Sequence, residues 1–254
     1  MSNEGSFQGV YARRRAFTLI ELLVVISIVV MLIALLLPVA HKARRQAYAV
    51  ACQANLHQWA MILQQYTGEY DGRFLRYVGG QSGGEWWRVL KPGVEEAEGL
   101  WRCPAKTFIP KYGPTSQSEY SLNCWTYDYQ PAPGDGDDYA DCWWRSVHAI
   151  RSPNRVPVLL DGYIQSLWCF PNAYEAPKPY EDAFHGGAMG HYCIGRHEGT
   201  TNAVFMDWSV RRVGLKELWT LKWHRQYNTA GPWTGAGGVL PEDWPQWMRH
   251  LKDY

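Results

Sequence analysis

The sequence predicts an α+β protein, in which a long N-terminal transmembrane helix continues into a soluble head with an antiparallel β-sheet and large irregular loops. Three observations carry this prediction. Residues 17–39 are almost entirely apolar, residues 40–66 contain neither glycine nor proline, and the chain after residue 72 alternates strand-like runs with turns. The head, residues 67–254, is long enough to form one domain with its own core.

Residues 17–39 have the properties of a membrane anchor. As a helix they would be about 35 Å long, and the apolar core of a bilayer is about 30 Å thick. The only charged residue in this segment is Glu21. A carboxylate within a bilayer costs at least about 2.5 kcal/mol at its centre, so we expect Glu21 to have a function. Three arginines precede the segment at residues 13–15, and no small-residue cleavage site follows it, which argues against an ordinary secretory signal.

We expect the helix to continue through residues 40–66 and to pack its second half on the head. Pro38 lies inside this helix, where it removes one backbone hydrogen bond. Gly68 and the pair Asp71–Gly72 are expected to end it. The small and apolar residues at helical spacing are Ala43, Ala47, Val50, Ala51, Ala54, Ile62 and Leu63.

Short elements are expected in the head. Alternating and β-branched runs predict strands at residues 73–78, 119–129, 155–162 and 201–213, the last as two strands around a tight turn. Short helical pieces are expected at residues 85–90, 95–100 and 216–224.

Composition narrows the function. Without residues 1–16 the chain has 22 basic and 23 acidic side chains, a net charge of −1, so we expect no nucleic-acid partner. The 14 tryptophans and 16 tyrosines are expected to fill the core, the alternative being a carbohydrate-binding surface of stacked rings. No G-x-S-x-G, H-E-x-x-H or Walker A sequence occurs, and we expect no enzymatic activity.

The N-terminal pattern resembles the precursors of type IV pilins and of the pseudopilins of type II secretion systems. The pattern is a basic leader, the junction Ala16–Phe17 and a TLIELLVV-type helix carrying Glu21. The resemblance implies that residues 1–16 are a leader, that a prepilin peptidase cleaves between Ala16 and Phe17, and that Phe17 is N-methylated. Glycine is usual before the cut, and Ala16 keeps that residue small. The resemblance also implies that Glu21 meets the N-terminal amine of a neighbouring subunit during filament assembly.

The same resemblance implies a location and partners. The arginines should stay in the cytoplasm, which makes the chain a single-pass protein of the inner membrane with its head in the periplasm or on the cell surface. The implied partners are other pilin-like subunits, the peptidase that also methylates, the inner-membrane assembly platform and membrane lipid. The implied role is structural, in a pilus or pseudopilus. The alternative is a binding or hydrolytic module that uses the pilin-like helix only as an anchor.

A second set of motifs resembles a large bacterial group of pilin-like proteins. These motifs are the run beginning at Cys52, the Cys103–Pro104 pair and residues 120–123. Chains of that group end in histidine, nine residues and Asp-Gly. His197 and Asp207 have this spacing, but Trp208 replaces the glycine. We expect His197 and Asp207 to be structural partners across the predicted turn, with Asp207 also bonding to the backbone two residues further on.

The cysteines are expected to be partly oxidised, because the implied compartment allows disulfides. Cys52–Cys103 is the preferred pair, although the sequence alone does not choose among the pairings of six cysteines. We expect no metal or other cofactor. Two weaker alternatives are a metal site formed by His185, His191, Cys193 and His197, with Asp207 as a further ligand, and a calcium site in the acidic loop that contains Asp135 and Asp137.

Overall fold

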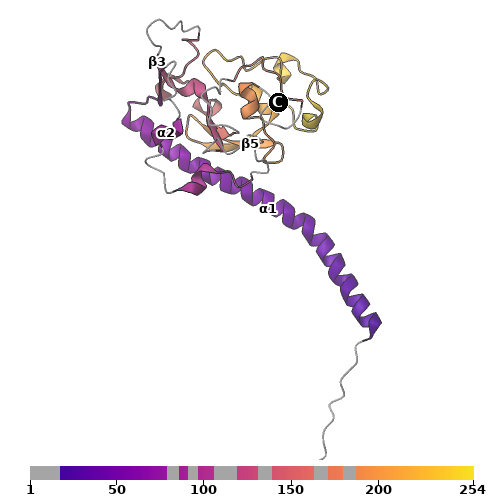
Figure 1. Cartoon of the computed structure of the whole chain (residues 1–254). Helices are drawn as coiled ribbons and strands as arrows, with labels where there is room; N and C mark the ends of the chain where they lie inside the picture. The colour runs from indigo at the N-terminus through magenta and orange to yellow at the C-terminus, as the bar shows by residue number, and fades with distance from the viewer. Residues whose placement is uncertain are drawn as a thin grey trace, which may run out of the picture. The chain divides into compact units, whose positions relative to one another are not determined.

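The computed structural model of the chain describes residues 18–78, 86–90, 97–105, 119–130, 139–162, 171–179 and 187–254 (Figure 1). The chain divides into two compact units, residues 1–44 and residues 45–254. One long helix, α1 (Leu19–Glu69), begins in the first unit and ends in the second. The second unit contains a four-stranded antiparallel sheet and long irregular connections. This architecture confirms the α+β class predicted from the sequence.

The two parts of α1 differ in burial. Every residue from 18 to 47 is exposed, including the whole apolar run. In residues 45–69, buried side chains recur every three or four positions, as expected for a helix with one face on a core. They are Ala49, Cys52, Leu56, Trp59, Ala60, Leu63 and Thr67. The face expected from the sequence was therefore partly wrong: Val50 is 64% exposed, whereas Cys52, Leu56 and Trp59 face the head.

α1 passes through Pro38 without a break and ends at Glu69, three residues later than expected. Its end is closed by the backbone N–H of Gly72, which donates to the carbonyl of Thr67 at 2.7 Å. Asp71 and Gly72 both have positive φ, 52° and 72°. A Cβ at Gly72 would lie 2.3 Å from the ring of His148. Glycine is therefore required at this position both for its backbone conformation and for the close approach of His148.

The main sheet consists of β2 (Tyr120–Leu122), β4 (Pro157–Asp161), β5 (Thr200–Phe205) and β6 (Val210–Gly214), in the order β2-β4-β5-β6. All neighbours are antiparallel. β4 is completely buried, as its unbroken apolar run predicts. The register places Asp161 opposite Tyr120 and Leu160 opposite Ala203. One end of β4 therefore brings a carboxylate next to β2 and β5.

The hairpin of β5 and β6 confirms the two strands predicted for residues 201–213. Its turn has the hydrogen bond from the Trp208 N–H to the Phe205 carbonyl, 2.8 Å, and Trp208 follows in the left-handed region with φ 64°. This is the position at which glycine is usual in such three-residue turns. Asp207 accepts a hydrogen bond from the Ser209 N–H at 3.0 Å, two residues on, as the sequence predicts.

The single strand expected at residues 119–129 was wrong. β2 ends at Leu122, and the 3-10 turn η3 (Cys124–Thr126) separates it from β3 (Asp128–Gln130). The break follows from Asn123. Its side chain accepts from the Trp125 N–H at 3.2 Å and donates to the carbonyls of Pro157 and Trp223 at 2.9 and 2.8 Å.

β3 pairs in parallel with β1 (Arg76–Val78), and the two strands form a small second sheet. The sequence did not predict this pairing. The expected short helical pieces are α2 (Trp86–Leu90) and the 3-10 turns η2 (Glu98–Trp101) and η8 (Lys216–Thr220). Further 3-10 turns are η4 (Val147–Ala149), η5 (Pro153–Arg155), η7 (Ala188–His191), η9 (Gly235–Gly237) and η10 (Gln246–Met248).

Aromatic side chains dominate the core of the head. Trp59 of α1 packs edge-on against Trp86 and Trp101, with ring centroids 5.1 and 4.6 Å apart. Tyr129 stacks on Trp143 at 4.5 Å. Among the tryptophan side chains that the structure describes, none is exposed. Most of the described tryptophans therefore belong to the core, while the exposed aromatic side chains in the described ranges are tyrosines, Tyr70, Tyr139, Tyr174 and Tyr254.

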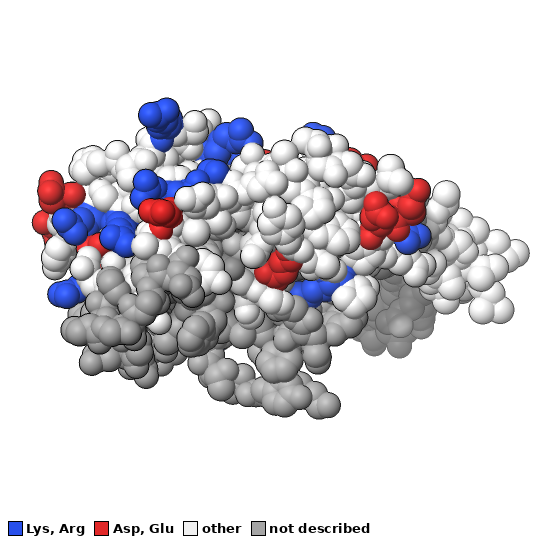
Figure 2. Space-filling model, turned by 90° about the horizontal axis from the view of Figure 1, so that it is seen from above, with Lys and Arg blue, Asp and Glu red and all other residues white. Residues whose placement is uncertain are grey.

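The described surface carries both signs of charge. Figure 2 shows one face on which basic and acidic side chains are interspersed rather than gathered into a single patch. This mixture agrees with the near-zero net charge of the chain. It gives that face no continuous positive surface for a polyanion.

Candidate functional site

The N-terminus of α1 is held by a reciprocal pair of side-chain bonds. The N–H and the hydroxyl of Thr18 both donate to Oε2 of Glu21 at 2.9 Å, and the Glu21 N–H donates to the Thr18 hydroxyl oxygen at 3.2 Å. This is a capping box, which satisfies donors that the first helical turn leaves unpaired. The Thr-x-x-Glu spacing in the sequence is the signal for it. Ala16 and Phe17, the predicted cleavage junction, lie outside the described residues.

α1 also carries the apolar segment. In the part of the chain that the structure describes, it is the one helix long and apolar enough to span a membrane, and none of that stretch is buried within the protein. An apolar surface of this length is costly in water. It is the surface expected of a membrane anchor or of a helix packed on other chains.

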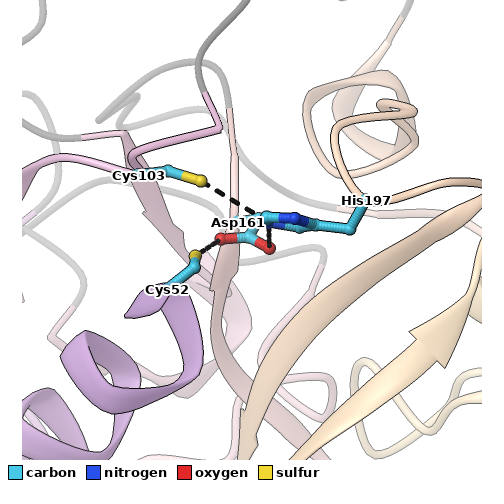
Figure 3. A group of neighbouring side chains, drawn as sticks. All are labelled: Cys52, Cys103, Asp161 and His197. Carbon is cyan, nitrogen blue, oxygen red and sulfur yellow. Dashed lines mark hydrogen bonds and ion pairs between the residues drawn. The ribbon is translucent and has the colours of Figure 1, made fainter. Parts of the chain in front are cut away.

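A second site lies inside the head, where four side chains from distant parts of the sequence converge (Figure 3). Cys52 belongs to α1, Cys103 follows η2, Asp161 ends β4 and His197 precedes β5. We call these four residues the Cys–Asp–His cluster. Each is 2% exposed or less. One ligand atom from each residue lies within 4.8 Å of all the others.

The contacts within the cluster form a chain. The thiol of Cys52 donates to Oδ1 of Asp161 at 2.6 Å. His197 Nε2 lies 3.0 Å from Oδ2 of Asp161 and 3.5 Å from the sulfur of Cys103. Figure 3 shows the two sulfurs on one side of Asp161 and the imidazole on the other. The two cysteines, which the sequence placed together as a preferred disulfide pair, are neighbours here as free thiols.

A surrounding layer of polar groups orients Asp161. Both the backbone N–H and the side-chain amide of Asn202 donate to its Oδ2, at 2.8 and 3.0 Å. Gln53 of α1 in turn donates to the Asn202 side-chain oxygen at 3.1 Å. The hydroxyl of Tyr120 lies 3.3 Å from the Cys52 sulfur. These bonds fix the carboxylate so that Oδ2 is shared by Asn202 and His197, while Oδ1 faces Cys52.

Burial and mutual contact shift the acidities of all four groups. Burial alone would raise the pKa of Asp161, but its hydrogen bond to His197 and the charge of that ring hold the pKa below its usual value. Burial would lower the pKa of His197, and its bonds to Asp161 and Cys103 raise it to about 9. The hydrogen bond from Cys52 lowers the pKa of Cys103 to about 6, whereas burial raises the pKa of Cys52. The cluster therefore favours a charged imidazolium–carboxylate pair beside an acidic thiol.

The expected pairing of His197 with Asp207 was wrong. The carboxylate that His197 contacts is Asp161, and the carboxylate of Asp207 is exposed and accepts from the N–H and hydroxyl of Ser209. The reason is geometric. The extended strand β5 lies between His197 and Asp207, and its six residues, at a rise of about 3.3 Å each, place its two ends roughly 16 Å apart.

Of the other sequence candidates for a metal site, the structure describes His191 and Cys193. His191 is half-buried in η7 and Cys193 is buried after it, and within the described ranges neither joins a group of potential metal ligands. His185, Asp135 and Asp137 lie outside the described residues. The residue that sequence reasoning missed is Asp161. Its signal is a carboxylate at the end of an entirely apolar strand, directly before Gly162, where an aspartate also suits an ordinary turn.

Comparison with known proteins identifies the N-terminal segment. Residues 11–37 match the family model described as the prokaryotic N-terminal methylation motif. The matched region covers the segment before α1 and the first part of that helix, including Glu21. No curated protein matches the chain, and no solved structure matches it either. The chain therefore carries a type IV pilin-like prepilin signal, while the resemblance of the region from His197 to Asp207 is not confirmed.

Proposed function

We propose that this protein is the precursor of a pilin or pseudopilin subunit that assembles into a type IV pilus or a type II secretion pseudopilus. The observation that carries the proposal is the methylation motif at residues 11–37, which overlaps the first part of α1, where every apolar side chain from Leu19 to Val39 is exposed. Such a helix suits two successive environments. Lipid covers it first, and the helices of other subunits cover it after assembly.

The proposed processing follows from the motif. A prepilin peptidase removes residues 1–16 by cleaving between Ala16 and Phe17 and methylates the new amino group. Arginines 13–15 hold the leader in the cytoplasm, so the head lies in the periplasm or on the cell surface. The partners are other pilin-like subunits, the peptidase and the assembly platform in the inner membrane. The role is structural, with polymerisation in place of catalysis.

Glu21 has two consecutive roles in this proposal. In the precursor it caps α1 through Thr18. After cleavage its carboxylate pairs with the methylated amine of Phe17 on a neighbouring subunit, which neutralises both charges in lipid. An unpaired charge in the bilayer is costly, so this pairing would favour the assembled state.

The test separates capping from charge pairing. The full-length protein and its variants are expressed in cells with a prepilin peptidase and an assembly machine. Mature mass and filament content are then measured. Wild type should begin at a methylated Phe17. Glu21→Gln keeps a side chain that can complete a capping box but removes the charge, so it should be processed normally and enter filaments poorly.

Thr18→Ala is the matched control, because it removes the cap and keeps the Glu21 charge. It should enter filaments much better than Glu21→Gln. Normal assembly of Glu21→Gln would show that the charge is not used as proposed. A mature protein that retains Met1 would contradict the proposed function as a whole.

A further inference from the structure

The Cys–Asp–His cluster has the composition and spacing of a metal site. We propose that Cys52, Cys103, Asp161 and His197 bind one zinc ion, which fastens α1 to the sheet of the head. The observation behind this is the convergence of four buried donor atoms, all within 4.8 Å of one another, from four segments that are far apart in the sequence. The inference does not depend on whether the protein forms filaments.

The spacing suits tetrahedral coordination. Zinc lies about 2.3 Å from sulfur and about 2.0–2.2 Å from nitrogen or oxygen, so the donors of a tetrahedral site lie roughly 3.3–3.8 Å apart. The contacts in the cluster are 2.6 Å from Cys52 Sγ to Asp161 Oδ1 and 3.5 Å from Cys103 Sγ to His197 Nε2. Shifts of about 1 Å or less in the side chains bring the four donors to the required spacing.

The donor set selects the type of metal. Two sulfurs and an imidazole favour zinc over calcium or magnesium, which prefer sites made only of oxygen. All four donors belong to the protein and all are buried. A closed four-donor site of this kind is structural, because it leaves no position for a substrate or a reactive water. Binding requires both sulfurs as thiolates and the imidazole as the neutral ring, so the protons that these groups still carry are released to solvent.

The polar layer around the cluster also fits. Metal-bound carboxylates are held by hydrogen bonds to their second oxygen. Asn202 supplies two such bonds to Oδ2 of Asp161, and Oδ1 remains directed towards Cys52. Two thiolates and one carboxylate around Zn²⁺ carry a net charge of −1. The guanidinium of Arg196, whose charge acts on both Cys103 and Asp161, offsets it.

A Cys52–Cys103 disulfide, expected from the sequence, is the competing arrangement. The two exclude each other, since a sulfur in a disulfide is not a thiolate ligand. The geometry favours the metal because each sulfur also contacts one of the other two donors, Cys52 Sγ at 2.6 Å from Asp161 Oδ1 and Cys103 Sγ at 3.5 Å from His197 Nε2. A disulfide would use neither the carboxylate nor the imidazole, and both are fully buried at this point.

The experiment measures metal and thiols in the full-length protein, purified in mild detergent without reducing agent or chelator. Elemental analysis should find about one zinc per chain. Replacement by Co²⁺ should give the thiolate-to-cobalt charge-transfer absorption and the visible bands of a four-coordinate site. Removing the metal should lower the Tm of the head by at least about 5 °C.

Four variants separate the two arrangements. Asp161→Asn and His197→Gln remove metal donors but leave both cysteines, so they should lose zinc, whereas a disulfide would survive them. Cys103→Ser should also lose zinc. Cys124→Ala is the matched control, because Cys124 is a buried cysteine outside the cluster, and it should keep zinc.

The wild-type measurements keep the proposal falsifiable even if a variant fails to fold. A Cys52–Cys103 disulfide found by non-reducing peptide mapping would overturn it. So would a folded wild-type protein with both thiols free and neither zinc retained nor Zn²⁺ or Co²⁺ bound on addition. Zinc that persists in His197→Gln and Asp161→Asn would place the ion elsewhere and would also overturn it.

Discussion

Replacing Trp59 by alanine tests whether the aromatic core fastens α1 to the head. Trp59 is fully buried, contacts the rings of Trp86 and Trp101, and donates its indole N–H to the Leu100 carbonyl at 2.9 Å. Truncating a buried tryptophan costs about 3–5 kcal/mol, and an unpaired buried carbonyl adds about 1 kcal/mol. For a domain of this size each kcal/mol lowers Tm by about 2–4 °C, so we expect a decrease of roughly 10–20 °C.

Near-UV circular dichroism of the detergent-solubilised full-length protein is the assay, because it reports aromatic packing and not the helix content of α1. Trp59→Phe keeps a ring but loses the bond to Leu100, so its Tm should lie between those of wild type and Trp59→Ala. Met61→Ala is the control on the same helix. Met61 is 61% exposed, and this change should alter stability by less than about 0.5 kcal/mol. A Trp59→Ala protein with the wild-type Tm would refute the argument.

Three further predictions concern the head, each measured as a urea midpoint against wild type. Asn123→Ala removes the buried side-chain bonds to the carbonyls of Pro157 and Trp223 and the bond from the Trp125 N–H, and should cost about 2–4 kcal/mol, although Trp144 still donates to the Trp223 carbonyl; a loss below about 1 kcal/mol would contradict this. Trp208→Gly should be more stable than Trp208→Ala by about 1 kcal/mol, because φ at this residue is 64°; the reverse order would contradict it. Burial, with a nearby lysine, lowers the pKa of His191 and of His224 to about 4. As the pH falls from 6.5 to 4, the unfolded chain therefore binds more protons than the folded protein does. The free energy of unfolding should decrease over this range by on the order of 1–3 kcal/mol for each histidine. The double variant with His191→Gln and His224→Gln should show a smaller decrease.

Features that depend only on residues close together in the sequence were predictable from it. The apolar run with Glu21 predicted the helix, and the alternation around Asp207 and Trp208 predicted the hairpin and its turn. The turn was predictable because the Asp207 side chain bonds only two residues away. The face of α1 that packs on the head was harder to predict, because small residues on both sides of the helix share its period.

The cluster depended on register, which no local pattern contains. Asp161 and His197 meet because β4 and β5 pair with Leu160 opposite Ala203. A shift of one residue would turn Asp161 to the other face of the sheet. The sequence did indicate that Cys52 and Cys103 lie close together, because both belong to motifs that resemble those of other pilin-like chains. It could not supply the carboxylate, because an aspartate before glycine resembles an ordinary turn.

The partners of α1 have a consequence for the order in which the protein folds. Trp59 contacts Leu100, Cys52 contacts Asp161 and Arg45 contacts Glu198, at sequence separations of 41, 109 and 153 residues. The ribosome makes α1 first, so its apolar stripe is complete long before these partners are synthesised. Contacts this distant form late, and an apolar helix face without its partners attracts chaperones and other unfolded chains. A nascent chain that stops before β5 therefore lacks part of the surface on which α1 docks. The buried face of α1 is completely covered only after the last third of the sequence has been synthesised.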